Sequence, residues 1–267
     1  MKTRTPILLA ACCAAALAQA ASAQQHKLVY AGDGTFGYRD TPTQPWSGFR
    51  VHDPDRPKPK TVEPGAFSTQ ERAGRPPSDA IILFDGKDIS QWKPNQWKVE
   101  NGELIATSGP FETVRDFGSY QLHLEWKAPD PPVGDNIMNR GNNGVLLMGS
   151  FEIQIFDPTT KIYPDGQAAA VYGQTPPLVN ASLPPGEWEV YDILFTAPRF
   201  EGGKLAEPAR VTVLYNGVLV QYNQEIYGPT VHAALPRPYR PGISRAPLAL
   251  GAHNNPVRFR NIWIRPL

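Results

Sequence analysis

The stretch 149–157 reads Gly149-Ser150-Phe151-Glu152-Ile153-Gln154-Ile155-Phe156-Asp157 and alternates apolar with polar residues over the length of one β-strand. Alternation turns the odd-numbered Phe151, Ile153 and Ile155 toward a core and the even-numbered side chains to the opposite face. That opposite face holds a carboxylate, an amide and an aromatic ring, a combination that suits a hydroxyl-rich ligand. The two interpretations open at this point are an ordinary strand with a polar outer face and a strand with a sugar-binding face.

Turn chemistry around this stretch indicates antiparallel β structure. Asn101-Gly102 and Asn216-Gly217 each lie between two β-prone runs, and both residues of such a turn adopt positive φ. No segment shows a convincing amphipathic helical pattern, and Pro- and Gly-rich loops separate the strands that we expect over 80–84, 120–127, 144–147, 189–196 and 258–265. The sequence therefore predicts an all-β chain, folded as an antiparallel β-sandwich or jelly roll.

The first residues have the pattern of an export signal. Lys2 and Arg4 precede an apolar run over 7–17, and Ala21-Ser22-Ala23 matches a signal-peptidase site, which predicts a signal peptide over 1–23. We expect a periplasmic or secreted protein; a lipoprotein box at Leu9-Ala10-Ala11-Cys12 is the alternative. Both cysteines, Cys12 and Cys13, fall within the signal, so the mature chain would have neither a disulfide nor a thiolate nucleophile.

The mature chain divides into an arm and a domain. Residues 24–79 are rich in Pro, Gly and charge without periodicity, which predicts an extended arm laid along the following domain, 80–267. The net charge of +1 becomes −1 when Lys2 and Arg4 are removed, so nothing attracts nucleic acid or an anionic membrane. No apolar run after the signal reaches the roughly 20 residues of a membrane span. The oligomeric state is left open.

Several polar side chains could line an open face of the sandwich. Glu125 alternates with apolar residues in 121–127, and Arg140 and Asn143 lie in a loop that leads into a strand. A long loop over 168–181 contains Tyr172, and long loops in compact domains are often functional. A histidine at a strand end among amides, His253, suits proton transfer better than a place in a core.

The order and number of several short motifs resemble the 3-keto-disaccharide hydrolase family. The resemblance covers residues 80–267 and implies a concanavalin-like jelly roll that acts on glycosides oxidised at C3. It is carried by Leu83-Phe84-Asp85-Gly86-Lys87-Asp88-Ile89-Ser90-Gln91-Trp92, Asn143-Gly144, Phe151-Glu152-Ile153-Gln154-Ile155, Val171-Tyr172-Gly173, Pro184-Pro185-Gly186-Glu187-Trp188 and Pro256-Val257-Arg258-Phe259-Arg260-Asn261-Ile262-Trp263.

The chemistry of such a substrate follows from its ketone. A carbonyl at C3 acidifies the C2 proton, and the glycosidic oxygen on C1 can leave by β-elimination, after which water completes net hydrolysis. The site needs a base near C2, a donor at the C3 oxygen and an acid for the leaving oxygen. We expect Glu152 and His253 as base and acid, in either order. The expected substrate-binding residues are Glu125, Arg140, Asn143, Gln154 and Tyr172; a divalent metal held by some of Glu125, Glu152, Asp157 and His253 is a further hypothesis.

Two other classes of function are open. Laminarinase-type retaining glycosidases share the jelly roll and carry Glu-x-Asp-x-x-Glu on one strand, where this chain has Glu152-x-Gln154-x-x-Asp157. A retaining mechanism needs two carboxylates at about 5 to 5.5 Å, so the amide at Gln154 counts against it. A non-catalytic sugar-binding module would need an aromatic platform and no base.

Overall fold

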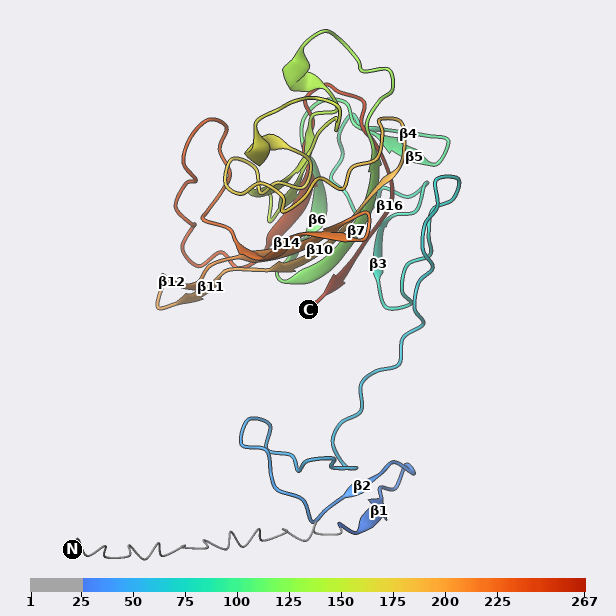
Figure 1. Ribbon diagram of the computed structural model, residues 1–267, viewed down its shortest axis with the longest axis vertical. Helices are drawn as coiled ribbons and strands as arrows, with labels where there is room; N and C mark the ends of the chain where they lie inside the picture. Colours follow the sequence, from blue (N-terminus) through green and yellow to red (C-terminus); the bar gives the residue numbers. More distant parts are fainter. Residues whose placement is uncertain (1–25) are drawn as a thin grey trace, which may run out of the picture. The chain divides into compact units, whose positions relative to one another are not determined.

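The computed structural model describes residues 26–267 (Figure 1). The expected signal peptide 1–23 and the expected mature start at Gln24 lie outside the described residues, so export stays a prediction. The chain splits into two compact units, the first ending at Thr61 and the second running from Val62 to Leu267. Over the described part of the chain, no helix is long and apolar enough to cross a membrane.

The first unit contains one short hairpin. Strands β1 (Leu28–Tyr30) and β2 (Phe36–Tyr38) pair antiparallel, and Gly37 lies so close to the following segment that a Cβ would be 2.3 Å from the His52 carbonyl oxygen. Arg39 donates two hydrogen bonds to the Asp55 carboxylate, at 2.8 and 3.0 Å. Residues 26–61 thus have local structure, which polar contacts and one close backbone approach hold in place. The sequence shows no hydrophobic periodicity there that would predict it.

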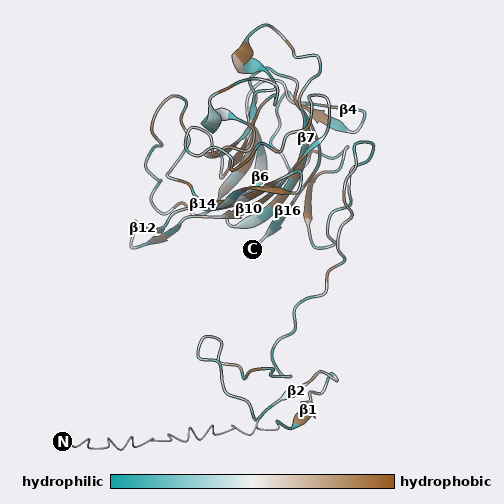
Figure 2. Ribbon diagram, in the orientation of Figure 1, coloured by the Kyte–Doolittle hydropathy of each residue, from teal (hydrophilic) through white to brown (hydrophobic). Residues whose placement is uncertain are grey.

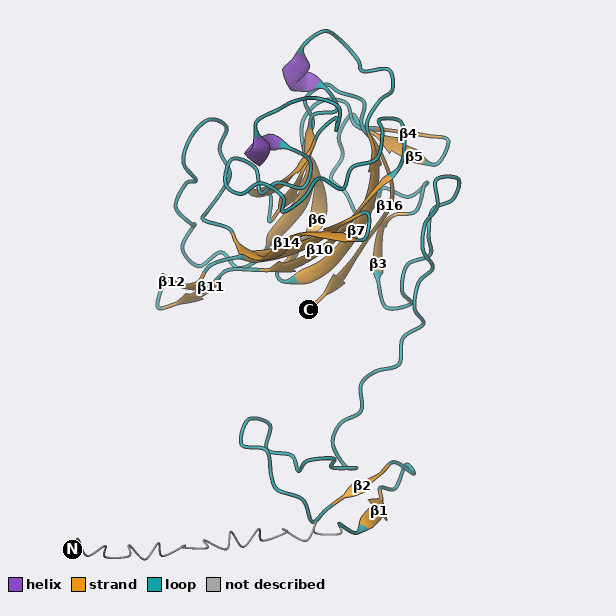
Figure 3. Cartoon of the chain, viewed as in Figure 1, coloured by secondary structure: helices purple, strands orange, loops and turns teal. Residues whose placement is uncertain are grey.

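The second unit is a sandwich of two antiparallel sheets (Figure 3). The larger sheet has eight strands in the order β14-β13-β10-β7-β16-β5-β4, with β3 also paired to β16; the smaller has the order β6-β15-β8-β9. The larger sheet comprises β3 (Ile81–Phe84), β4 (Lys98–Glu100), β5 (Glu103–Ile105), β7 (Tyr120–Lys127), β10 (Glu189–Thr196), β13 (Arg210–Tyr215), β14 (Val218–Glu225) and β16 (Arg258–Pro266). The smaller comprises β6 (Phe111–Phe117), β8 (Asn143–Leu147), β9 (Phe151–Ile155) and β15 (Ala246–Leu250). A ribbon of β11 (Arg199–Glu201) and β12 (Lys204–Glu207) and two 3-10 turns, Ile137–Asn139 and Pro164–Gly166, complete the unit.

The core lies between the two sheets, where apolar residues alternate along the strands (Figure 2). Strand β9 contributes Phe151, Ile153 and Ile155, all buried, as the alternation of 149–157 predicts. Strand β7 contributes Leu122 and Leu124 from the facing sheet, both fully buried. The polar residues of β7 and of β9 must therefore point to opposite outer faces of the sandwich.

The predicted antiparallel β-sandwich is confirmed. Both Asn-Gly turns have positive φ at both positions, 54° and 80° at Asn101-Gly102 and 50° and 78° at Asn216-Gly217. The strands expected over 120–127 and 189–196 have those bounds in the structure. Strands β6 and β15 were not expected, because three consecutive exposed residues interrupt β6 and a proline lies inside β15.

Residues 62–79, which we call the strap, belong to the second unit, although the sequence assigns them to the arm. A bridge between Ala66 and Arg75 closes a loop in the strap. Gln70 receives a hydrogen bond from the Trp188 backbone at 2.6 Å and donates one to the Trp188 carbonyl at 3.0 Å. The strap is thus tied to the larger sheet's outer face, while the domain boundary at residue 79 stays a prediction.

Candidate active site

Glu152 lies on the outer face of the smaller sheet, on β9, with its carboxylate packed over Gly144 of β8. A Cβ at Gly144 would be 2.2 Å from Glu152 Oε1, so a larger residue at position 144 would displace the carboxylate. Within residues 26–267 the carboxylate has no hydrogen-bond or ion-pair partner. Burial without compensation raises the pKa of Glu152 to about 7. A carboxylate held in this way is a base of useful strength at neutral pH.

The segment 169–172 extends the smaller sheet beyond β9. Val171 bridges to Ile153, and the Tyr172 amide donates to the Glu152 carbonyl at 3.0 Å, so Tyr172 is the cross-strand neighbour of Glu152. The Ala170 carbonyl accepts from the Gln154 amide at 3.0 Å in the same ladder. Gln154, on the same face of β9 as Glu152, is 2% exposed, and its side-chain oxygen accepts from the Ile155 amide. Gln154 is therefore not on an open surface, contrary to our expectation of a substrate-binding amide.

The Tyr172 hydroxyl is the centre of a hydrogen-bonded chain. It lies 2.9 Å from the Tyr163 hydroxyl and 2.6 Å from Nδ1 of His232. Burial, the hydrogen bond with Tyr163 and the charges of Glu152 and Asp165 raise the pKa of Tyr172 above its usual value. The phenol therefore keeps its proton at neutral pH and can act as a donor.

His253 lies in the loop that follows β15. The Gly251 amide donates to the Gly144 carbonyl at 2.8 Å, which brings the start of this loop to the glycine over which Glu152 packs. Burial and the neighbouring His232 lower the pKa of His253, so its imidazole is neutral at physiological pH. The structure thus brings Glu152, Tyr163, Tyr172, His232 and His253, which we call the Glu152 cluster, to one accessible region of the second unit.

Glu125 is not part of this cluster. It lies on β7 and faces away from the core on the outer side of the larger sheet, where it is fully buried beneath the strap. Its carboxylate accepts hydrogen bonds from Arg260 Nε at 2.6 Å, Asn261 at 2.7 Å and Ser68 at 2.5 Å. The alternation along 121–127 is as expected, but the strap occupies the face that we expected to bind substrate.

Arg140, Asn143 and Asp157 lie where β8 begins and β9 ends. Asn143 shares the core side of β8 with Val145, is fully buried, and accepts from the Gly144 amide. The Arg140 carbonyl accepts from the Asp157 amide at 3.0 Å. Neither Arg140 nor Asn143 is brought beside the Glu152 carboxylate by any contact of the described residues, so their expected role in substrate binding stays a prediction.

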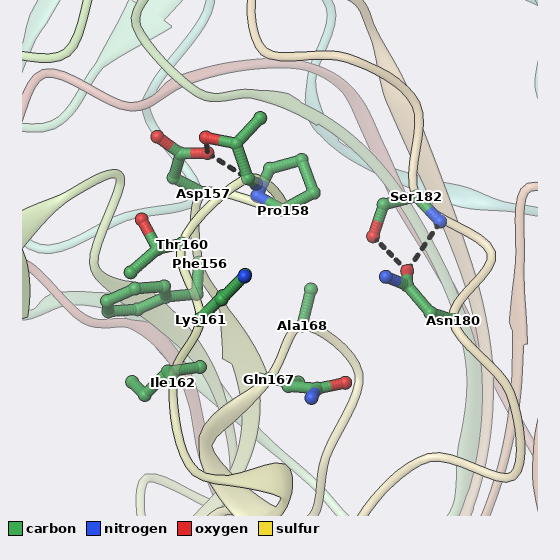
Figure 4. Close-up of a pocket in the computed structure, with 11 residues that line it drawn as sticks. Phe156, Asp157, Pro158, Thr160, Lys161, Ile162, Gln167, Ala168, Asn180 and Ser182 are labelled. Atoms are coloured by element: carbon green, nitrogen blue, oxygen red, sulfur yellow. Dashed lines mark hydrogen bonds between the residues drawn. The ribbon is translucent and has the colours of Figure 1, made fainter.

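Asp157 lines a separate pocket of about 290 Å³ (Figure 4). Its carboxylate accepts from the Thr159 amide and hydroxyl, at 2.8 and 2.7 Å. Asn180 and Ser182, which bond to each other, form the opposite side of the pocket. Of the four side chains of the metal hypothesis, Glu125 and Asp157 thus lie apart from Glu152 and His253, and residues 26–267 contain no group of three His, Cys, Asp or Glu suited to a metal ion.

Sequence reasoning missed His232 and Tyr163. His232 follows a Gly-Pro-Thr-Val run that has no periodicity, and Tyr163 lies in a Pro-rich loop. Only the folding of the loops 156–173 and 226–245 over the smaller sheet brings these side chains to Tyr172. A local signal did exist in Tyr163, Tyr172 and His232, since polar aromatic residues in loops are common at binding sites.

Comparisons with known proteins agree with this architecture. The family model described as a 3-keto-alpha-glucoside-1,2-lyase-like domain matches residues 79–265. A candidate glycosyl hydrolase from Parabacteroides distasonis has a solved structure that is similar over 85% of this chain and 100% of its own, with 36% identity and a TM-score of 0.74. A second structure from that organism shares the fold at 21% identity and a TM-score of 0.53, covering 71% of this chain and 94% of its own. No curated protein matches the chain.

The chain is a member of the 3-keto-disaccharide hydrolase family, as the motifs of its sequence predict. It is a carbohydrate-active protein of the glycoside hydrolase or lyase type.

Proposed function

We propose that this protein cleaves glycosides that carry a ketone at C3, by removal of the C2 proton and β-elimination of the aglycone, with hydration of the product to complete net hydrolysis. The observation that carries the proposal is the Glu152 carboxylate, which packs over Gly144 without a polar partner and has its pKa raised to about 7. A perturbed carboxylate beside a phenol and two imidazoles is the kind of arrangement that enzymes use for proton transfer.

The steps divide among the residues of the Glu152 cluster. Glu152 takes the C2 proton, because its raised pKa makes it a stronger base than an ordinary carboxylate. His253, whose imidazole is neutral, donates a hydrogen bond to the C3 oxygen as negative charge develops on that oxygen. The leaving oxygen also needs a proton, and the cluster contains a phenol, Tyr172, that holds one.

The retaining-glycosidase alternative finds little support in the geometry. Such an enzyme needs a second carboxylate at about 5 to 5.5 Å from the first. Asp157, the second acid of the sequence pattern, is 2% exposed and bonds to Thr159, and Gln154 lies covered between the two. A desolvated carboxylate without a polar partner lowers stability, and binding a sugar does not require such a group. Its presence therefore favours an enzyme over a sugar-binding module.

The test is a comparison of a glucoside with its 3-keto derivative. The purified protein is incubated with each, with and without chelator, and the products are identified by mass. We expect cleavage of the 3-keto substrate alone, because only the ketone makes the C2 proton removable by a carboxylate. Equal cleavage of both substrates would overturn the elimination mechanism, and loss of activity with chelator would show that a metal takes part.

A further inference from the structure

Two hydrogen bonds reach the Tyr172 hydroxyl oxygen, and the direction in which each of them runs bears on the reaction. A phenol has one proton to donate and can accept two hydrogen bonds. When the Tyr163 hydroxyl and Nδ1–H of His232 both donate to the Tyr172 oxygen, across 2.9 and 2.6 Å, the single Tyr172 proton is free for a substrate oxygen.

The placement of Tyr172 matches the bond that must break. Tyr172 and Glu152 are directly opposite each other in the ladder between 169–172 and β9, so their Cβ atoms lie about 4.5 to 5.5 Å apart. Elimination needs a base at C2 and an acid at the oxygen on C1, which are adjacent carbons of one ring. Two side chains from one cross-strand pair supply groups at that spacing.

We propose that Tyr172 is the acid that protonates the leaving oxygen and that His232 is a positioning residue that holds the Tyr172 proton toward the substrate; the proposal rests on the function proposed above. In the elimination, Glu152 takes the C2 proton, the C2–H electron pair becomes the C1=C2 double bond, and the C1–O bond breaks with its pair on the leaving oxygen, which takes the proton of Tyr172.

Hydration of the C1=C2 double bond then reverses both proton transfers. The Tyr172 phenolate takes a proton from water, the hydroxide adds to C1, and the proton held by Glu152 goes to C2. Water is the only co-reactant, and both side chains return to their starting protonation states. The same pair therefore serves the lyase half and the hydration half of one cycle.

A comparison of two leaving groups distinguishes an acid role of Tyr172 from a merely structural role. Two 3-keto glucosides are compared, one with a 4-nitrophenyl leaving group, which departs without a proton, and one with a second glucose, which does not. Release of the leaving group is followed for the wild type, Tyr172→Phe, His232→Leu and His232→Asn, with thermal unfolding of each. Tyr222→Phe is the matched control, because Tyr222 is an exposed tyrosine on the larger sheet.

We expect Tyr172→Phe to lower kcat for the glucosyl leaving group by about 10²- to 10⁴-fold, the range for loss of a general acid, and to change kcat far less for nitrophenyl. His232→Leu should show the same selectivity with a smaller loss, and His232→Asn should recover activity because its amide can donate to Tyr172. Equal losses on both substrates, or full activity of Tyr172→Phe, would overturn the acid assignment. A wild type that cleaves neither 3-keto substrate would overturn the proposed function, and the assignment with it.

Discussion

Two regions of the second unit combine a glutamate with histidine and differ in almost every other respect. On the larger sheet, Glu125 lies with His123 beneath the strap and accepts hydrogen bonds from Arg260, Asn261 and Ser68. On the smaller sheet, the half-buried Glu152 has no polar partner for its carboxylate among the described residues and lies opposite Tyr172, whose hydroxyl is bonded to His232. The difference lies in which side chains surround the acid, since both glutamates alternate with apolar residues on a strand.

The pKa values of the two regions diverge for physical reasons. Burial opposes ionisation of Glu125, but hydrogen bonds from His123, Ser68, Asn261 and Arg260 outweigh it and lower its pKa to about 2. Burial likewise lowers the pKa of His123, yet hydrogen bonds to Asp192 and Glu125 raise it to about 9. Glu152 is desolvated in the same way but has no hydrogen-bond partner for its carboxylate, so its pKa rises to about 7. A saturated ion network stabilises structure, whereas an uncompensated acid is available for chemistry.

The largest expected effect is the loss of activity in Glu152→Gln. The amide keeps the shape but cannot take a proton, so kcat on a 3-keto glucoside should fall by about 10²- to 10⁴-fold. Stability should rise, by an amount that grows as the pH increases from about 4.5 to about 7 and is constant above pH 7, because the variant no longer carries a carboxyl that must ionise while desolvated. Steady-state kinetics at neutral pH and thermal unfolding at pH 4.5 and pH 8 check both. A variant that retains turnover would remove Glu152 from the mechanism.

The matched substitution on the other face is Glu125→Gln. Removing one partner of a buried ionic network leaves the buried charge of Arg260 without its carboxylate, while His123 keeps Asp192, and breaking such a pair typically costs about 3 to 5 kcal/mol. We expect the free energy of unfolding in urea to fall by that amount, while kcat per folded molecule stays that of the wild type. Lost turnover in a variant of unchanged stability would mean that the two regions have been assigned the wrong roles.

Between neutral pH and pH 9, the free energy of unfolding should decrease as the His123 imidazole loses its proton. Its pKa is raised from 6.5 to about 9 in the folded protein, so its contribution is fully present below pH 6.5 and is lost as the pH rises to 9. The loss is at most about 3 kcal/mol, from 1.36 kcal/mol per pKa unit. Urea unfolding between pH 7.5 and 9, above the pKa of about 7 that Glu152 and Glu189 share, measures it. A flat profile would show that His123 is not held as a cation.

A smaller effect is expected from Gly144→Ala, which adds a methyl group where the Glu152 carboxylate lies. The side chain must move, and displacement of a reacting group by about 1 Å can cost up to about 100-fold in rate, so we expect a 10- to 100-fold fall in kcat. Gly102→Ala is the control: it lies at a turn with φ of 80° and open space around it, so it should cost about 1 kcal/mol of stability and no activity. Equal kcat values for the two variants would contradict the packing of Glu152 over Gly144.

The sequence predicts what depends on local pattern. Alternation identified the core side of β9 and the outward position of Glu152, and the Asn-Gly pairs located two turns with the observed positive φ. The same local rule turned Glu125 and Gln154 outward, but it contains no information on what covers an outer face. The strap covers Glu125, and on the smaller sheet Gln154 is buried while Glu152, on the same face of the same strand, is only half-buried.

Residues that reach the site from loops were harder to identify. His232 and Tyr163 have no periodicity around them, and their positions depend on long-range packing of two loops over the smaller sheet. His253 was identifiable because it lies among amides shortly after a strand, which ends at Leu250. Strand order and loop placement are therefore the information that single-sequence patterns lacked here.

The most direct measurement of the difference between the two regions is an NMR titration of the side-chain carboxyls in ¹³C-glutamate-labelled protein, with Glu152→Gln and Glu125→Gln used to assign the two signals. We expect Glu152 to titrate near pH 7 and Glu125 to stay ionised down to a pH of about 2. Two glutamates that titrate together in the ordinary range, around 4.3, would contradict it.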